Sequence, residues 1–449
     1  MPAQPSSRAS TWLLLLAAPR RPQAAYLTAD IVTADLSLSL AEFLARNSSE
    51  RDLVAASLYS DRVCTAEETF RRIEPCLTGH GITRLGRLTG LDRIGIPVWQ
   101  AISPNAKSIV INNGKGITDL DAKVSAAMEA LERTVAGAPA VKTISASQRE
   151  LLAKGQHADP LSSLIASGQA DIGDDEEIAW TEGRDLIADR NVWIPFGAIT
   201  LDRTPLNARF WQSSDGLASG NVLTEAILHG LLERIERDAK ELWDVSEPAL
   251  RTKTCVDPAS LADPVLNELL RKIEDAGLTL KLFDMTSDVK IPAYTVFLGP
   301  GEINRAKHVR YIDVTMGCGA HPSSVRAAIR AVTEAAQSRL TFISGARDDI
   351  HPKDFTRELP ESIRRYFEAV PKAAARPDEA LPDGAEALLH LTIDRLRHAG
   401  INSAIALSLG DASLPFAVAK LILPQLENPA GDRKRRFGYR AISKTLQLL

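Results

Sequence analysis

The sequence predicts a mixed α/β protein, α+β in the broad sense, built from repeated strand–loop–helix units with mixed sheets. Two observations support this prediction. Three times along the chain a short apolar segment runs into small residues and then into a long stretch of helical periodicity, at residues 108–137, 207–243 and 309–349. The composition, with 45% hydrophobic and 24% charged residues, is that of a globular protein and not of a disordered one.

Charge and composition exclude several functional classes. A net charge of −4 and a pI of about 6.1 provide no basic field for nucleic acid. No apolar run reaches the roughly 18–20 residues of a membrane span. The four cysteines are irregularly spaced without a CxxC pair, so neither a zinc finger nor a disulfide framework is expected. An apolar patch at Trp12–Ala18 is followed by arginines, which disfavours a secretory signal, and we therefore expect a cytoplasmic protein.

Local patterns predict the elements of the repeated region. Residues 65–80 are typical of a capped helix, and residues 81–102 alternate like short strands. The first unit is expected to hold a strand at Ser108–Asn112, a turn at Asn113–Gly116 and a helix that begins at Thr118 or Asp119. In the second unit, the apolar segment is Ala208–Trp211.

The rest of the chain has weaker signals. We predict an extension at 1–60 of unknown role, one domain at 61–425 and a tail at 426–449. The remaining expected elements are a solvated acidic loop (Asp171–Glu177), a helix (256–275), paired strands (278–286 and 293–299), an irregular segment or lid (Pro352–Asp383), a helix followed by two strands (Ser403–Ser408 and Phe416–Ile422), and a solvated basic run (Arg433–Arg436).

The helix of the second unit carries an unusual row of polar residues. Four of them follow one another at i, i+4, i+8 and i+11, within a strip roughly 80° wide: Glu225, His229, Glu233 and Glu236. An apolar strip lies beside this row and can pack against a core. Three carboxylates in one row repel one another unless a cation lies among them.

The three units can be aligned without gaps along their helices. Counting starts at Gly116, Gly220 and His321. Position 13 is then Glu129, Glu233 and Glu334; position 16 is Glu132, Glu236 and Gln337; position 17 is Arg133, Arg237 and Ser338; position 9 is Ser125, His229 and Arg330. A single ExxER is common on exposed helices, where it forms weak salt bridges. Three copies in register instead predict helices that converge on one site.

Acidic pairs on two helices supply the oxygen ligands that Mg²⁺ prefers, and Mg²⁺ commonly bridges phosphates. Glu225 adds a fifth carboxylate. The segments NNGKG, SGN and GCGAH, each before a helix N-terminus, are expected to be loops that approach phosphate closely, with Lys115 as a positive charge. NGKG is not a Walker A loop, because Ile109 stands where that loop has glycine.

Two further residues have alternative interpretations. His229 is either a proton relay or a satisfied polar filler, and the filler is favoured. Cys318 precedes a helix, where a thiolate would be stabilised, but packing in a small-residue segment is favoured over a role as nucleophile. No GxSxG elbow or Cys/His signature indicates a covalent hydrolase.

Taken together, these residues resemble the YcaO family over roughly residues 65–425. The resemblance is carried by NGKG with SxxxExxER (Ser125, Glu129, Glu132, Arg133), by GN with ExxxxxxxExxER (Asn221, Glu225, Glu233, Glu236, Arg237), and by RxxxExxQ (Arg330, Glu334, Gln337). It implies an ATP-binding fold of the YcaO type, unrelated to P-loop or kinase folds. It also implies Mg²⁺ ligands at Glu129, Glu132, Glu233 and Glu236, and ATP contacts at Lys115, Ser125, Asn221, Glu225, Arg237, Arg330, Glu334 and Gln337. Glu225 is either a metal or a nucleotide ligand, and no catalytic side chain is assigned.

Members of this family use ATP to activate a backbone amide of a peptide or protein. A neighbouring Cys, Ser or Thr of the substrate then gives an azoline, whereas a sulfide source gives a thioamide. This chain ends in AISKTLQLL and lacks the proline-rich PxPxP terminus common among the cyclodehydratases, and GITRLGRLTGLDRIGIPV is similar to YcaO proteins paired with a TfuA partner. The resemblance thus implies a peptide or protein substrate and a TfuA-like partner, with thioamide and azoline formation and a homodimer all left open.

Two other hypotheses remain at this point. The first is a non-catalytic accessory protein that binds nucleotide and assists another protein-modifying enzyme. The second is an unrelated metalloenzyme with an acidic cluster. Phosphate release in the presence of peptide discriminates against the first, and dependence of metal binding on ATP discriminates against the second.

Overall fold

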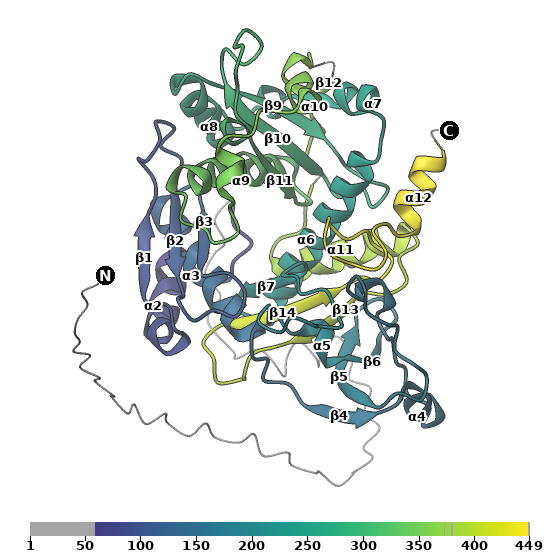
Figure 1. Cartoon of the computed structure of the whole chain (residues 1–449). Coiled ribbons are helices and arrows are strands. Elements are labelled where there is room, and N and C mark those ends of the chain that lie inside the picture. The colour runs from purple at the N-terminus through teal and green to yellow at the C-terminus, as the bar shows by residue number, and fades with distance from the viewer. Residues whose placement is uncertain (1–58, 372, 379, 448–449) are drawn as a thin grey trace, which may run out of the picture. The chain divides into compact units, whose positions relative to one another are not determined.

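The computed structural model describes residues 59–371, 373–378 and 380–447. The apolar patch at Trp12–Ala18 and nearly all of the expected extension lie outside these residues. Within them, three β-sheets with helices packed on their faces form the mixed α/β arrangement that the sequence predicts (Figure 1). No helix in this part of the chain is long and apolar enough to cross a membrane.

The strands pair mainly as antiparallel neighbours. Their bounds are β1 (Arg84–Arg87), β2 (Val98–Ile102), β3 (Ile111–Lys115), β4 (Thr143–Ala146), β5 (Ile178–Asp185), β6 (Arg190–Pro195), β7 (Leu217–Gly220), β8 (Cys255–Asp257), β9 (Leu278–Asp284), β10 (Ala293–Pro300), β11 (Thr315–Ala320), β12 (Ala373–Ala374), β13 (Ile405–Ser408) and β14 (Ala417–Ile422). The sheets have the orders β1-β2-β3, β11-β10-β9-β8-β12 and β4-β5-β13-β14-β7, with β6 added on β5. The β12–β8 pair is parallel, so the five-stranded sheet is mixed, whereas the named strands of the other two sheets pair antiparallel.

The helices include three long ones that follow β3, β7 and β11. The α-helices are α2 (Ala66–Leu77), α3 (Asp119–Ala136), α4 (Gln148–Ala153), α5 (Phe196–Ile199), α6 (Leu223–Asp244), α7 (Pro248–Lys253), α8 (Pro264–Asp275), α9 (Ser324–Ser344), α10 (Glu361–Arg364), α11 (Ala385–His398) and α12 (Tyr439–Leu446). Short 3₁₀ turns cover Thr78–His80, Ser162–Leu164, Pro258–Leu261, Tyr311–Asp313, Pro352–Phe355 and Arg365–Glu368. Thr118 caps α3 through a capping box with Asp121, as predicted.

The three repeated units close into a ring. Each long helix packs on the strand that precedes it: α3 on β3, α6 on β7 and α9 on β11. Each also contacts the strand of another unit, α3 with β7, α6 with β11 and α9 with β3. Because these contacts run cyclically, the same face of each helix is directed toward the middle of the ring. The predicted convergence of the helices is therefore confirmed.

The small-residue segments that precede the helices are strands, and their prediction as turns or loops was wrong. Asn113, Gly114 and Lys115 belong to β3, and Gly317 and Gly319 belong to β11. A Cβ on Gly114 would lie 2.0 Å from the backbone nitrogen of Ala126 in α3, and one on Gly317 would lie 2.2 Å from the carbonyl oxygen of Ala331 in α9. These glycines are needed because a helix backbone lies directly against the strand.

Other boundaries also moved. The strand of the second unit is β7, not the predicted segment Ala208–Trp211, in which Phe210 forms only an isolated bridge with Ile165. The predicted helix at 256–275 begins only at Pro264, because Cys255–Asp257 forms strand β8, which pairs with β9. That hairpin, the helix α11 and the strands β13 and β14 agree with the prediction.

The largest cluster of buried apolar side chains surrounds α6. Its apolar strip includes Leu228, Leu232, Ile235 and Ala239, each at most 1% exposed. At the end of the helix, Trp243 packs with an aromatic group of Phe283, Phe297 and Tyr366, whose ring centroids lie 4.5–6.4 Å apart. This packing holds the polar row of α6 toward the ring of helices.

The predicted solvated tail is instead docked on the domain. Arg433 is 7% exposed, and its guanidinium lies over the ring of Trp211 at 4.5 Å. Arg436 pairs with the buried Glu241 at 2.6 Å, and α12 follows. Lys434 and Arg435 are exposed, as predicted. The prediction failed for Arg436 because its acidic partner Glu241 lies 195 residues earlier in the chain.

Candidate functional site

The acids of the three helices face one another in the ring. Burial raises the pKa of Glu132 in α3 well above its ordinary value, and the charges of Glu129 and Glu233 raise it further. Burial also raises the pKa of Glu236 in α6, and Glu334 in α9 adds to this effect. Each helix therefore contributes carboxylates that repel acids of another helix. The repeated sequence register correctly predicted this meeting.

Glu233 is an acid whose pKa is raised strongly by this arrangement. Burial raises its pKa to about 7; Arg237 opposes the shift, whereas Asp215 and Glu236 strengthen it. Its side chain keeps 28% of its exposure, so it remains accessible to a ligand. A cation placed beside Glu233 would remove the cause of this shift.

Basic side chains of the chain itself partly neutralise the acids. Arg237 lies between Glu233 and Glu236, at 3.5 and 3.4 Å. Arg133 pairs with Glu129 at 3.1 Å, and Lys115 at the end of β3 pairs with Glu334. Among the described residues, no three His, Cys, Asp or Glu side chains stand close enough to form a finished metal cage. The acids therefore lie around the ring in separate ion pairs and do not converge on one metal position.

Side chains on β7 and β14 also contribute to the site. Ser219 of β7 donates its hydroxyl to the Glu132 carboxylate at 3.1 Å, which links the second unit to α3. Lys420 of β14, which the sequence analysis missed, donates to the carbonyls of Ser213 (3.0 Å) and Asp215 (2.7 Å). Burial lowers the Lys420 pKa to about 8, and the charges of Asp215 and Glu233 oppose this shift. No local pattern marked Lys420, because it lies in an apolar strand.

The N-terminal end of α6 binds its own carboxylate. Glu225 is 1% exposed and accepts the backbone N–H of Asn221 at 2.7 Å and its side-chain amide at 3.1 Å. It also accepts the N–H of Val63 and pairs with Arg62 at 3.2 Å. Asn221 in turn accepts the hydroxyl of Thr69 at 2.9 Å. Asn221 and Glu225 therefore lie in direct contact at the start of α6.

Arg62 is the functional candidate that the sequence analysis overlooked. Besides Glu225, it reaches the carbonyl oxygen of Ser219 at 3.2 Å and Nδ1 of His229 at 3.0 Å. Arg330 of α9 approaches the other ring nitrogen of His229 at 3.5 Å and donates to the carbonyl of Ala320 at 3.1 Å. The nearest sequence signal is Thr65, the N-cap of α2, which lies three residues after Arg62.

His229 is a neutral part of this group. Burial lowers its pKa well below the ordinary range, and the charges of Arg62 and Arg330 add to the effect. A histidine held neutral between two guanidinium groups fits the favoured interpretation as a polar filler better than that of a proton relay. Ser125 and Gln337, the other predicted members of the site, are half-buried on α3 and α9.

Cys318 is a packed thiol. It is 2% exposed, and burial raises its pKa to about 12, with Glu236 and Glu334 adding to the shift. The interpretation as a nucleophile favoured by a helix N-terminus is therefore wrong, because burial and the two acids disfavour the thiolate more than the charges of Lys240 and Arg237 favour it. Its backbone N–H instead contacts the Glu334 carboxylate at 3.4 Å.

We predict that Cys318 is inert in the folded protein. A pKa about three units above the ordinary value lowers the thiolate fraction roughly 1,000-fold. Labelling with a disulfide-exchange reagent at pH 8, read by peptide mass spectrometry, should modify Cys318 only after denaturation. Modification of Cys318 in the native protein, at a rate like that of the half-buried Cys76, would contradict this prediction.

Comparison with known proteins places this ring in a family. Residues 113–427 match the model of the YcaO cyclodehydratase family, which is described as ATP- and Mg²⁺-binding. The protein in the tfuA 3′ region of Rhizobium leguminosarum bv. trifolii is 36% identical over 400 residues, which cover 88% of this chain and 95% of that protein. The chain belongs to the YcaO family.

This chain is also similar to a further curated protein and to solved structures. An uncharacterized protein of Methanothermobacter thermautotrophicus is 34% identical over 382 residues, covering 82% of this chain and 95% of that protein. YcaO from Methanopyrus kandleri, solved with AMPPCP and Mg²⁺, superposes with a TM-score of 0.65 at 22% identity over 84% of this chain and 94% of that one. A heterocyclase in complex with substrate and cofactor gives a TM-score of 0.71 at 21% identity over 90% of this chain, which spans 57% of that heterocyclase. These two structures share the fold.

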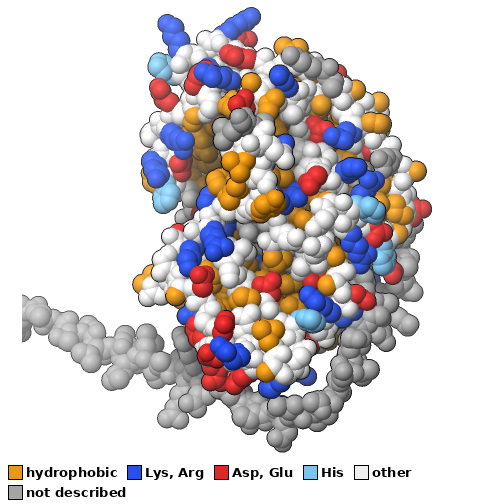
Figure 2. Space-filling model, turned by 90° about the vertical axis from the view of Figure 1, so that its right-hand side faces the viewer, with side chains coloured by type: hydrophobic (Ala, Val, Ile, Leu, Met, Phe, Trp, Pro, Cys, Tyr) orange, Lys and Arg blue, Asp and Glu red, His pale blue; other side chains and the backbone are white. Residues whose placement is uncertain are grey.

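The residues of this YcaO chain fit ATP and Mg²⁺, the ligands of the family. The site acids on α3, α6 and α9 number six, and burial and mutual repulsion raise the pKa of three of them, Glu132, Glu233 and Glu236. Hard cations with oxygen ligands relieve such repulsion. On the face turned toward the viewer in Figure 2, basic and acidic side chains are interspersed.

Proposed function

We propose that this YcaO protein uses ATP and Mg²⁺ to activate a backbone amide of a ribosomally made peptide or protein, leading to a thioamide or an azoline. The single observation that carries the proposal is the meeting of carboxylates from α3, α6 and α9 at the centre of the ring. Membership of an ATP- and Mg²⁺-binding cyclodehydratase family supports the same chemistry.

The residues divide into two groups under this proposal. The carboxylates on α3 and α6 hold Mg²⁺: Glu129, Glu132, Glu233 and Glu236. The residues around them bind ATP: Lys115, Ser125, Asn221, Glu225, Arg237, Arg330, Glu334 and Gln337. Bound Mg²⁺ offsets charge on the phosphates. Arg237 is paired with Glu233 and Glu236 in the structure, and metal bound to those acids would free its guanidinium for the phosphates. Lys115 is paired with Glu334, which lies in the ATP-binding group.

The proposed reaction needs positioning more than covalent help from the protein. The amide oxygen attacks the γ-phosphorus, the bond from that phosphorus to the bridging oxygen breaks, and ADP leaves. A nucleophile then adds to the amide carbon, and inorganic phosphate leaves with the former amide oxygen. With a side chain of the substrate as nucleophile, the product is a ring; with a sulfide donor, it is a thioamide. Arg237 and Arg330 are suited to stabilise charge on the transferred group.

Mass spectrometry tests the proposal directly. The purified protein is incubated with ATP, Mg²⁺ and a short peptide encoded beside its gene, with and without a sulfide donor. Addition to the activated amide changes the peptide mass by a loss of about 18 Da for ring closure or a gain of about 16 Da for sulfur exchange. The expected result is one of these shifts, together with phosphate release in equal amount. Tight ATP binding without phosphate release for any peptide would instead favour the accessory-protein hypothesis.

We also propose that a TfuA-like protein assists this reaction. The similarity to the protein in the tfuA 3′ region supports this pairing. A TfuA-like protein encoded nearby should raise the rate of sulfur exchange at limiting sulfide. An equal rate with and without that protein, across sulfide concentrations, would contradict the pairing.

A further inference from the structure

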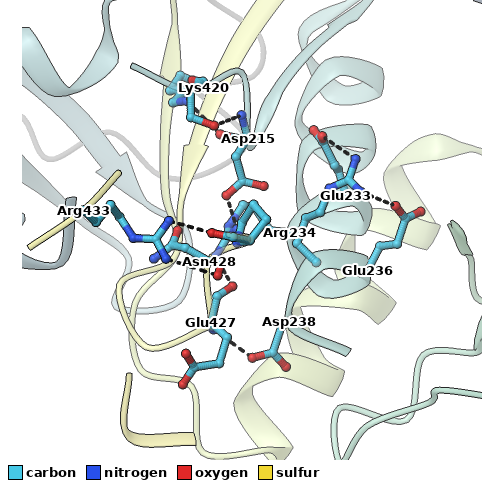
Figure 3. A network of polar contacts seen from close by, with 12 residues as sticks. Asp215, Glu233, Arg234, Glu236, Asp238, Lys420, Glu427, Asn428 and Arg433 are labelled. Atoms are coloured by element: carbon cyan, nitrogen blue, oxygen red, sulfur yellow. Dashed lines mark hydrogen bonds and ion pairs between the residues drawn. The ribbon is translucent and has the colours of Figure 1, made fainter. Parts of the chain in front are cut away.

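The helix α6 carries a second set of charged residues that the proposed chemistry does not use. Arg234, Asp238 and Glu241 lie on one flank, rotated by about 120° from the face of Glu233 and Glu236. They are only 2%, 0% and 6% exposed. Figure 3 shows Arg234 and Asp238 on a different side of the helix from Glu233 and Glu236. Charges buried in this way are costly unless each is paired, so their partners matter.

Most of these partners come from one segment, residues 427–441, here named the strap. Asp238 accepts two hydrogen bonds from the Arg440 guanidinium, at 2.9 and 2.8 Å, and a third from the backbone N–H of Glu427 at 2.9 Å. Arg234 donates to the carbonyl of Glu427 at 2.9 Å and also pairs with Asp215. The flank is therefore held by residues about 190–200 positions away in the sequence.

The strap is itself tied into a fixed shape. The carboxylate of Glu427, which is 1% exposed, accepts the N–H groups of Gly438 (2.7 Å) and Ala441 (2.8 Å) at the start of α12. The guanidinium of Arg433 donates to three strap carbonyls, those of Asn428, Pro429 and Arg436. Hydrogen bonds from Gly438 and Ala441 to Glu427 join the two ends of the strap. The strap can therefore resist a movement of α6.

We infer that the strap is a positioning device for α6 and that Arg440 is its decisive residue. The two-pronged contact of Arg440 with Asp238 fixes the rotation of α6 about its axis and so the direction of Glu233 and Glu236. On a helix 10–12 Å across, a rotation of about 10° moves a side-chain end by about 1 Å. A displacement of this size in a reacting site can cost about 100-fold in rate. The inference rests on the proposed function in that Glu233 and Glu236 bind metal.

The test compares Arg440→Met with the matched variant Arg184→Met in the full chain. Arg184 is the more deeply buried of the two arginines, with 2% of its side chain exposed against 13% for Arg440, and it pairs with Asp189 on the β5–β6 hairpin. Calorimetry measures the Mg²⁺ concentration that half-saturates ATP binding. We expect Arg440→Met to raise it at least about 10-fold, as loss of an outer contact to metal ligands does, and Arg184→Met to leave it within about 2-fold. Hydrogen exchange along residues 231–241, without ligand, should accelerate in Arg440→Met only.

Further variants keep the test decisive if Arg440→Met does not fold. Arg440→Lys preserves the charge but cannot form both guanidinium hydrogen bonds to Asp238. Its Mg²⁺ requirement should therefore lie between those of the wild type and Arg440→Met. Asp288→Asn removes only the half-exposed second partner of Arg440 and should behave like the wild type. An unchanged Mg²⁺ requirement in Arg440→Lys, or equal shifts in Arg440→Met and Arg184→Met, overturns the inference. Failure of the wild type to modify peptide bears on the proposed function alone, because these readouts need no peptide.

Discussion

Glu233→Gln is expected to abolish nucleotide-dependent peptide modification, with a loss of at least about 100-fold, while leaving the fold intact. Loss even of an outer contact to metal ligands commonly costs 10–100-fold, so loss of a ligand should cost more. The amide keeps the size and one oxygen of the side chain but not its charge. Glu236→Gln should give the same result, because Glu236 occupies the same face one turn later. The measurement is the yield of modified peptide per unit time by mass spectrometry.

The same substitution should stabilise the protein in the absence of ligand. Glu233 has a folded-state pKa of about 7 against an ordinary 4.5, so the folded state binds this proton more tightly than the unfolded chain. Its contribution to stability is fully present below pH 4.5 and is lost as the pH rises through 7. Glu233→Gln removes that loss, so without Mg²⁺ and ATP the variant should gain on the order of 1–3 kcal/mol over the wild type at pH 8 and nothing at pH 4.

Asp244→Asn is the matched control, since it removes an exposed carboxylate from the end of the same helix. It should leave modification and the pH dependence unchanged. Denaturant titrations at pH 4 and pH 8, with and without Mg²⁺ and ATP, provide the readout. If Glu233→Gln keeps full turnover, or is less stable than the wild type at pH 8 without ligand, Glu233 is not a metal ligand held in a strained acidic ring.

Gly114→Ala is expected to cost about 3 kcal/mol or more of folding stability, because overpacking against a backbone cannot be relieved by a side-chain rotation. The added Cβ would lie 2.0 Å from the nitrogen of Ala126 and 2.3 Å from the carbonyl oxygen of Ala122. The helix α3 must then move away from β3, taking Glu129 and Glu132 with it. Gly317→Ala should behave alike in the third unit, where the Cβ meets Ala331 at 2.2 Å.

Gly79→Ala serves as the control, since no atom lies within 4 Å of its added Cβ. It should change stability by less than about 1 kcal/mol, in the stabilising direction. Urea unfolding followed by circular dichroism measures all three variants. A Gly114→Ala protein as stable as Gly79→Ala would show that the contact between strand and helix is looser than the structure has it.

Much of the site follows from the sequence because its pattern is local. Glu225, His229, Glu233 and Glu236 share a face simply by their spacing on one helix, and the structure keeps them there. The repeat added the other acids, since the same count from Gly116 and Gly220 leads to Glu129 and Glu233. Helix and strand identities in 385–422 were also predictable from periodicity.

What the sequence alone determined is therefore the set of repeated helices, the face of each that carries acids, and the resemblance to the YcaO family. Only the tertiary structure decided that NNGK is a strand under a helix, that Arg62 reaches Glu225, and that Arg433 and Arg436 of the basic run dock on the domain. The physical reason is distance along the chain. Periodicity reports on neighbours one or two turns away, whereas Arg62 and Arg440 find their partners 163 and 202 residues away. Such pairs form only once folding has closed the ring and brought the strap against α6.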